Sequence, residues 1–481
     1  MSRPNIIDLY KAEKHTVKFM QFGEGNFLRA FVDYMIDVAN EKVDFDAGVA
    51  IVKPIDYGNL DAFKKQDNIY TLILRGVSEG KTINESRIIK SIAEVMDARE
   101  DYAHMCETAC LDTLRFVVSN TTEAGIVFDN TDKFELEPPA TYPGKLTKML
   151  YLRWKAFNGA ADKGLIMLPV ELIDTNGAKL KECVNSLAKL WGLEENFIAW
   201  VNECNIFCNT LVDRIVTGNP RDEKEALCEK AGYDDDLMDI GEPFGLWVIA
   251  SDRIDEVKAE LPLDKAGMPV VFTDNIKPYR ERKVRVLNGA HTSLVLGAYL
   301  AGLDTVGDCM ADTLMRKYID RAVFDEIVPL VPLPLEEVKA FAASVMERFE
   351  NPFIRHQLLS IALNSVSKWR ARVLPSVIDY VNTNGKLPEV LTFSFAALAA
   401  FYSKGERDGV KYEVRDDAAV IEFFAENSAL SSAELIAKLV AREDFWGMNL
   451  GELNGFADYA AAALEDIRTM GAKAAIEKLL A

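Results

Sequence analysis

The sequence predicts an α/β protein, in which a doubly wound domain with a parallel sheet is followed by a mostly α-helical domain. Three observations predict this fold class. The chain has 481 residues, which is more than one hydrophobic core normally supports. Apolar strands alternate with helical patterns over roughly 170 residues of the first part of the chain. Beyond Asn288 the apolar spacing is helical almost throughout.

The first domain begins with a strand, a glycine turn and a helix in residues 17–40, "VKFMQFGEGNFLRAFVDYMIDVAN". Further buried strands are predicted in "GVAIVKPID", "LRFVVSNTTEAG" and "KGLIMLPVELIDTNG", where an apolar run passes into polar turn residues. Because helical patterns separate these strands, we expect βαβ units of one parallel sheet with right-handed crossovers.

The last convincing strands lie in "GLWVIA" and "MPVVFTDNIKPYRERK". Helical spacing follows in "SLVLGAYLAGL", "HQLLSIALNSVSKWRARVL" and "LTFSFAALAAFY", separated by short breakers such as "NTNGKLPE". The boundary is therefore predicted near residue 276, with a dinucleotide-binding domain in residues 1–276 and a helical substrate domain in residues 277–481.

Composition excludes several classes of function. The formal net charge of -20 argues against a nucleic-acid partner, and no apolar stretch is long enough to predict a membrane span. The start of the chain has no apolar signal core, so a cytoplasmic location is expected. Seven scattered cysteines fit reduced thiols, and Cys204 with Cys208 lacks a second pair of ligands, so no metal site is predicted.

The turn after the first strand has Gly23 and Gly25, but Leu28 replaces the third glycine of a dinucleotide-binding G-x-G-x-x-G motif. Glycines at this position let the backbone approach a pyrophosphate, which would bind the amides of the following helix N-terminus in a Rossmann-type domain. Arg29 is expected near the phosphates, or else is an ordinary exposed helix arginine. The residues of this turn predicted to bind the cofactor are Phe22, Gly23, Gly25, Asn26, Phe27 and Arg29.

The second strand should end in the acid that binds the adenosine ribose, and here the chain has Lys53 and then Asp56. Lysine would tolerate a 2′-phosphate and aspartate would select NAD, so the residues alone leave NAD and NADP open. The segment "SNTTEAG" offers polar groups for the nicotinamide ribose from Ser119, Asn120, Thr121 and Glu123. Alternatively it is a helix-capping turn, with Thr121 or Thr122 as the N-cap.

Lys283, Asn288 and His291 fall within an arc of roughly 140° if their segment is an α-helix. Such a lysine can exchange a proton with a hydroxyl group during hydride transfer, because burial and nearby like charges lower its pKa. Asn288 and His291 could stabilise negative charge on oxygen, so no metal is required. The alternatives are a solvated basic run and a histidine that fills the core.

Lys-x-x-x-x-Asn-x-x-His, following an N-terminal G-x-G-x-x-x-Arg, resembles the signature of the mannitol dehydrogenase family of polyol-specific long-chain dehydrogenases. The resemblance covers nearly the whole chain. It implies that Lys283 is the general base, that Asn288 and His291 polarise the oxygen and that catalysis is independent of zinc. It also implies active-site roles for Asp213 and Arg214 in "NTLVDRI", and a substrate contact for Lys368.

Two departures from the mannitol dehydrogenases, Leu172 and Ser360, make a neutral polyol a doubtful substrate. Several segments are most similar to family members that reduce keto-hexuronates with NADH, which implies NAD and a keto-hexuronate here. Arg355, His356 or Lys368 would then bind the carboxylate. The alternatives are an epimeric keto-hexuronate, a hexitol phosphate, or an inactive protein that only senses NAD.

Overall fold

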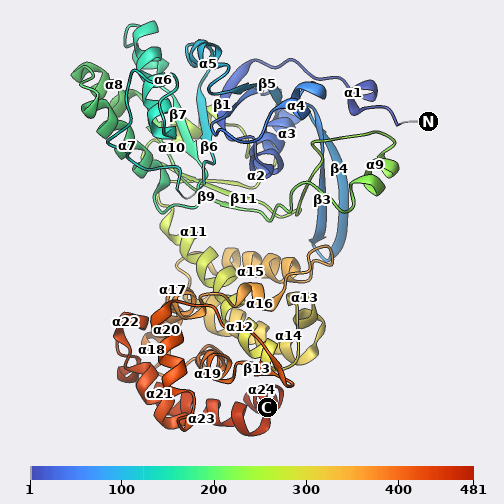
Figure 1. Cartoon of the computed structure of the whole chain (residues 1–481), viewed down its shortest axis with the longest axis vertical. Coiled ribbons are helices and arrows are strands. Elements are labelled where there is room, and N and C mark those ends of the chain that lie inside the picture. The colour runs from blue at the N-terminus through green and yellow to red at the C-terminus, as the bar shows by residue number, and fades with distance from the viewer. Residues whose placement is uncertain (1–2, 123) are drawn as a thin grey trace. The chain divides into compact units, whose positions relative to one another are not determined.

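The computed structural model describes residues 3–122 and 124–481, and the chain divides into two compact units (Figure 1). The sheet unit comprises Met1–Arg75 and Thr82–Ile276, and the helical unit comprises Gly76–Lys81 and Lys277–Ala481. The predicted fold class, a parallel-sheet α/β domain followed by a mostly helical one, is confirmed. The grouping of residues 76–81 with the helical unit was not predicted.

The sheet unit is built on six parallel strands in the order β5-β2-β1-β6-β7-β8. This is the strand order of a doubly wound dinucleotide-binding fold, in which the chain reverses direction along the sheet between β1 and β6. Ligands bind at the carboxyl ends of the strands beside that point. The strands are β1 (Val17–Phe22), β2 (Gly48–Lys53), β5 (Ile92–Asp97), β6 (Phe116–Ser119), β7 (Ile166–Pro169) and β8 (Ile206–Phe207).

Alternate residues of each strand enter different cores, as the period of two requires. In β2, Val49 and Ile51 join one apolar cluster, and Ala50 and Val52 join the other. The first cluster contains α2 (Asn26–Leu28), the π-helix η1 (Arg29–Asp33) and α3 (Tyr34–Val43). The second contains α5 (Tyr102–Ala109), α6 (Tyr142–Ala156), α7 (Asn176–Leu190) and α8 (Glu195–Cys204), and Figure 1 shows α6, α7 and α8 gathered on one side of the sheet.

Two smaller three-stranded sheets complete the sheet unit, in the orders β10-β3-β4 and β12-β11-β9. The sequence predicted β11 and β12 but not β3 and β4, which are inserted between the second and third strands of the main sheet. Most residues of β4 are at least partly exposed, so its apolar pattern is weak. The bounds are β3 (Tyr70–Ser78), β4 (Lys81–Ile89), β9 (Asn209–Asp213), β10 (Asp239–Gly241), β11 (Leu246–Ala250) and β12 (Val270–Thr273). Three further helices are α4 (Asp61–Lys65), α9 (Lys224–Ala231) and α10 (Ile254–Glu260).

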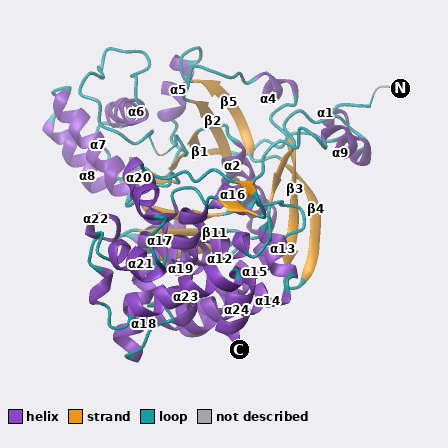
Figure 2. Cartoon of the chain, turned by 60° about the horizontal axis from the view of Figure 1, so that its bottom comes forward, coloured by secondary structure: helices purple, strands orange, loops and turns teal. Residues whose placement is uncertain are grey.

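The helical unit is organised around α12 (Gly289–Leu300) and α19 (Glu389–Lys404), which are buried on nearly every side and pack against each other. A helix that is apolar all round belongs in a core. Figure 2 shows the other helices of this unit around them. They include α11 (Lys277–Arg282), α15 (Leu335–Phe349), α16 (Leu358–Ile361), α17 (Ser365–Arg372), α18 (Leu374–Asn384), α21 (Ser432–Val440), α23 (Phe456–Met470) and α24 (Ala472–Leu480). None of the helices described in either unit is both long enough and apolar enough to cross a bilayer.

A buried polar cluster lies beneath the glycine turn of the sheet unit. Gln21 Nε2 donates to Asp33 Oδ2 at 3.3 Å, and an Arg29 nitrogen lies 3.9 Å from Asp239 Oδ2. Each of these four side chains also has one buried polar atom without a hydrogen-bond partner in the described part of the chain. Burial raises the pKa of Asp33 to about 7, against a lowering effect of the Gln21 hydrogen bond and of Arg29.

The raised pKa of Asp33 predicts a pH-dependent effect on stability. Folded Asp33 keeps its proton up to about pH 7, whereas the unfolded carboxyl loses it near its ordinary pKa of 3.8, so its stabilising effect falls as the pH rises between these values. Asp33→Asn cannot titrate. The free energy of unfolding of this variant minus that of wild type should therefore increase between pH 5 and pH 8. The increase should be a few kcal/mol, since each pKa unit corresponds to about 1.4 kcal/mol.

Thermal unfolding of both proteins at the two pH values measures this difference. Asp222→Asn, at an exposed position, is the control and should show no change with pH relative to wild type. An equal stability difference for Asp33→Asn at both pH values would contradict the assigned pKa.

Candidate active site

The glycine turn has the geometry of a phosphate-binding turn. Gly23 has a φ of +128°, and its amide donates to Val52 O, which ties the turn to β2. A side chain at Gly25 would meet no atom within 4 Å, so there is open space above the backbone. Gly25 is also the N-cap of α2, and no side chain caps that helix end. The first amides of α2 therefore remain available to an anion, and these residues fit a pyrophosphate.

Arg29 is not the exposed arginine that was one of its two sequence interpretations, because only 5% of its surface is accessible. Its guanidinium donates to Leu237 O and to Asn26 Oδ1 and lies near Asp239. Both terminal nitrogens of the guanidinium are thus already bound to protein oxygens. The geometry therefore argues against the predicted phosphate contact and gives Arg29 and Asn26 a supporting role beneath the turn.

A cavity of about 350 Å³ follows β2, at the position where a doubly wound fold holds an adenosine. Asp56 lines it and forms a 2.6 Å ion pair with Arg99, and both side chains are exposed. Lys53 is buried instead, and its amine donates to Asp97 and to Ile55 O at 2.6 Å each. Asp56 is therefore available to a ribose hydroxyl, whereas Lys53 is already bound by protein oxygens.

The loop after β6 is held by Glu171, a residue that the sequence reasoning missed. The buried carboxylate accepts hydrogen bonds from Ser119 Oγ at 3.1 Å, from the Thr121 amide at 3.0 Å and from Thr121 Oγ1 at 2.9 Å. Burial raises the pKa of Glu171. The available signal was its position directly after β7, since neighbouring parallel strands end at the same edge of the sheet.

The alternative interpretation of "SNTTEAG" as a helix cap is wrong for the described residues, because the next helix, α6, begins only at Tyr142 with Thr141 as its N-cap. The Asn120 amide donates to Phe22 O, which places this loop beside the glycine turn. Phe27 packs on Phe31 in the core beneath that turn. Glu123, also predicted to bind the cofactor, lies outside the described residues.

Asp213 is the last residue of β9 in the sheet unit, Arg214 follows it, and both are buried. The guanidinium of Arg214 donates to the backbone carbonyls of Phe244, Ala30 and Pro243. Burial lowers the pKa of Arg214 to about 10. With three carbonyls as acceptors, Arg214 connects three segments of the sheet unit, and this geometry argues against a direct substrate contact.

In the helical unit, Lys283–Asn288 forms a π-helix, η3, rather than the α-helix on which the predicted arc was based. A π-turn pairs residues i and i+5, so Lys283 and Asn288 come closer to one face than an α-helix would allow. His291 follows Asn288 by three residues in α12, a spacing that also shares a face. The prediction of a common face survives, but the assumed period was wrong.

The basic run around Lys283 is only partly solvated, since Lys277 is exposed and the two arginines nearest Lys283 are not. Arg282 is buried and ion-paired with Glu337, and Arg285 is ion-paired with Asp379 at 2.5 Å. These carboxylates partly neutralise the positive charge next to Lys283.

His291 is stacked on Phe349 with ring centroids 4.1 Å apart, and His356 meets it edge-on at 5.4 Å. Its Nε2 is buried and has no hydrogen-bond partner among the residues that the structure describes. Burial lowers the pKa of His291 well below its ordinary value, and nearby cations add to this effect. A neutral imidazole with an unused ring nitrogen is suited to hydrogen-bond a ligand oxygen. If His291 only filled the core, its stacking on Phe349 would be explained, but its buried Nε2 without a hydrogen-bond partner would not.

Several basic side chains lie near His291 within the helical unit. Those that lower its pKa are His356, Arg348, Arg372 and Lys368. Lys368 Nζ donates to Ile361 O at 2.9 Å. Arg355, the other predicted carboxylate ligand, is exposed in the loop between α15 and α16. The structure thus places His356 and Lys368 near His291, and it adds Arg348 and Arg372, which the sequence reasoning did not single out.

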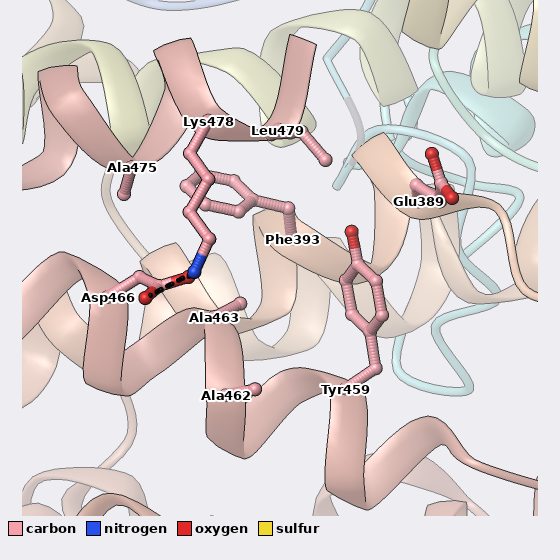
Figure 3. A pocket seen from close by; sticks show the side chains of 9 residues that line it. All are labelled: Glu389, Phe393, Tyr459, Ala462, Ala463, Asp466, Ala475, Lys478 and Leu479. Carbon is pink, nitrogen blue, oxygen red and sulfur yellow. Dashed lines mark hydrogen bonds and ion pairs between the residues drawn. The ribbon is translucent and has the colours of Figure 1, made fainter. Parts of the chain in front are cut away.

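Figure 3 shows a separate cavity of about 260 Å³ that is lined by residues of α19, α23 and α24. It contains none of the predicted site residues, and the ion pair of Lys478 with Asp466 closes one side. Its lining is mostly apolar, so we interpret it as a packing cavity. No group of three or more potential metal ligands occurs among the described residues.

Comparisons with known proteins agree along nearly the whole chain. The family described as mannitol dehydrogenase Rossmann domain matches residues 17–263, and mannitol dehydrogenase C-terminal domain matches residues 275–468. Curated proteins named altronate oxidoreductase, from Shigella flexneri and Escherichia coli, are each 44% identical over 477 residues, which cover 98% of both chains.

Two solved structures share the fold at lower identity. A mannitol 2-dehydrogenase of Pseudomonas fluorescens, in a ternary complex with NAD and D-mannitol, has a TM-score of 0.68 at 23% identity and covers 98% of this chain and 96% of its own. A substrate-free D-sorbitol dehydrogenase has a TM-score of 0.81 at 22% identity, with 99% and 97% covered.

The hydrogen bonds of Glu171 predict a measurable effect on cofactor binding. In Glu171→Ala the loop of Ser119 and Thr121 loses three hydrogen bonds, so the Kd for NADH should rise by about tenfold, equivalent to about 1.4 kcal/mol. Titration of NADH by fluorescence measures it. Glu182→Ala, on the exposed side of α7, is the matched control and should bind as wild type does. Unchanged affinity in a folded Glu171→Ala protein would show that this loop does not contribute to the cofactor site.

Proposed function

Because this chain belongs to the mannitol dehydrogenase family, we propose that it is an NAD-dependent reductase that reversibly converts D-tagaturonate to D-altronate. As a member of that family it is an oxidoreductase that acts on CH–OH groups. The observation that carries the finer proposal is the similarity, over nearly the full length of both chains, to proteins named altronate oxidoreductase. The cationic groups around His291 support an anionic substrate.

NAD is proposed over NADP because of the residues at the end of β2. Asp56 faces the proposed adenosine cavity and can accept a hydrogen bond from a ribose hydroxyl, which a 2′-phosphate would replace with negative charge. Lys53 is bound to Asp97 and cannot balance that charge without breaking a buried ion pair. When bound, the nicotinamide supplies or accepts the hydride at the keto carbon.

The chain's own part of the reaction is proton transfer and charge stabilisation. Lys283 gives a proton to the substrate oxygen as the ketone is reduced, and it removes that proton in the reverse direction. Nε2 of His291 has no hydrogen-bond partner among the described residues, and Asn288 lies three residues before it, so the imidazole and the side-chain amide can both bind this oxygen. His291 is held neutral, so it acts as a hydrogen-bond donor and Lys283 remains the proton source.

A screen of NADH and NADPH oxidation against keto-uronates and ketoses tests the proposal. D-tagaturonate should be reduced with NADH, and product analysis should give D-altronate. Preferential reduction of D-fructuronate to D-mannonate would assign the epimeric substrate, and oxidation of a hexitol phosphate would assign that rival. No oxidation of either cofactor with any substrate would favour a protein that only senses NAD.

Replacing the proposed proton donor should affect chemistry more than binding. Lys283→Met should lower kcat by roughly 10²–10⁴-fold, the usual contribution of general acid–base catalysis, with the Kd for NADH little altered. Steady-state kinetics and NADH titration measure the two quantities. Lys339→Met, at an exposed lysine of α15, is the matched control. Near-normal turnover of Lys283→Met at neutral pH would end the assignment.

A further inference from the structure

Arg372, the last residue of α17, has an unusual environment for an arginine of this chain. Its side chain is half-buried, yet its guanidinium makes no hydrogen bond or ion pair within the described residues. Other half-buried arginines of the helical unit are paired, such as Arg285 with Asp379 and Arg407 with Asp304. The chain has 75 acidic against 55 basic residues, so partners are plentiful. A partly buried charge without a counter-charge is costly, and a bound anion would offset that cost.

The position of Arg372 connects it to the proposed catalytic residues. Its carbonyl oxygen lies 3.0 Å from where a Cβ at Gly289 would be, so the end of α17 touches the backbone next to Asn288. Arg372 also acts on His291 electrostatically. Burial is the cause that lowers the pKa of Arg372, which is consistent with the lack of a nearby carboxylate. The unpaired cation and the unused nitrogen of His291 therefore belong to one region of the helical unit.

The other cations of this region are less suited to bind a carboxylate. Lys368, one helical turn before Arg372, donates to Ile361 O and is subject to the charge of Asp416. Arg348 has interactions of its own. Arg355 is exposed, where water competes for an anion. A guanidinium can also hold a carboxylate through two parallel hydrogen bonds, which an ammonium cannot do.

From this geometry we propose that Arg372 binds the carboxylate of the substrate and so selects a sugar acid over a neutral sugar. The inference rests on the proposed function, whose substrate it describes more closely. It replaces the sequence-based expectation that Arg355 or Lys368 carries this role. Arg372 is thus a specificity-determining residue, and its loss should weaken substrate binding without changing the proton donor.

The test compares Arg372→Met and Arg372→Lys with wild type. Arg372→Met should raise the KM for D-tagaturonate and the inhibition constant of the product D-altronate at least tenfold, with the Kd for NADH changed less than twofold. Arg372→Lys keeps the charge but loses the paired hydrogen bonds, so its KM should be intermediate. Added guanidinium ion should lower the KM of Arg372→Met. Turnover of the neutral ketose D-tagatose should not fall in either variant.

Arg370→Met is the matched control, because Arg370 lies on the same helix, is exposed and makes only a long contact to Asp444 O. It should behave as wild type does. A KM within twofold of wild type for Arg372→Met, or a tenfold rise in Arg355→Met or Lys368→Met alone, would overturn the inference. If Arg372→Met does not fold, a KM of Arg372→Lys within twofold of wild type would overturn the inference instead. Absence of any keto-uronate reduction by wild type would instead remove the proposed function itself, and the inference with it.

Discussion

The close approach of α17 to α12 at Gly289 is the constraint on which the candidate site of the helical unit depends. A Cβ atom at position 289 would lie only 3.0 Å from the carbonyl oxygen of Arg372, which is closer than such contacts normally are. Asn288 and His291 lie on one side of this contact, and Lys368 and Arg372 on the other. Without glycine the helices would have to separate, and the cations would move away from the histidine.

In the sheet unit, buried side chains hold the polar loops at the carboxyl ends of the parallel strands. Glu171 binds the loop after β6 with three hydrogen bonds. The side-chain amide of Asn176 binds Pro169, Thr210 and Gly177, so the end of β7 and the start of β9 are tied to the start of α7. Beside these buried side chains, the first backbone amides of α2 have no side-chain cap and can bind an anion. Glu171 and Asn176, which hold these loops, are therefore residues that no sequence motif identified.

Much of the fold could be predicted from the sequence, because buried parallel strands are continuous apolar runs and core helices keep a regular apolar period. The inserted β4 was not predicted because its mostly exposed residues lack that pattern. β3 was also missed, although its first four residues are buried and mostly apolar. The π-helix at Lys283 was not predicted because apolar periodicity does not distinguish one wide helical turn from an α-helix. The backbone contacts of Arg29 and Arg214 could not be predicted because their acceptors, Leu237 and Ala30, are far away in sequence. Motifs identified candidate residues, but they did not reveal which side chains support the site and which face the ligand.

The charges of the helical unit explain how one group of residues can both attract an anion and keep a hydrogen-bond donor neutral. Arg348, Lys368 and Arg372 lower the pKa of His291, so the imidazole does not compete with Lys283 as a proton source. A bound carboxylate would cancel part of this field and raise the pKa again. Burial, however, is the largest cause of the shift, and a substrate that excludes water strengthens it. Burial therefore continues to favour the neutral imidazole when an anion binds, and the cations can serve substrate recognition while the proposed donor Lys283 supplies the proton.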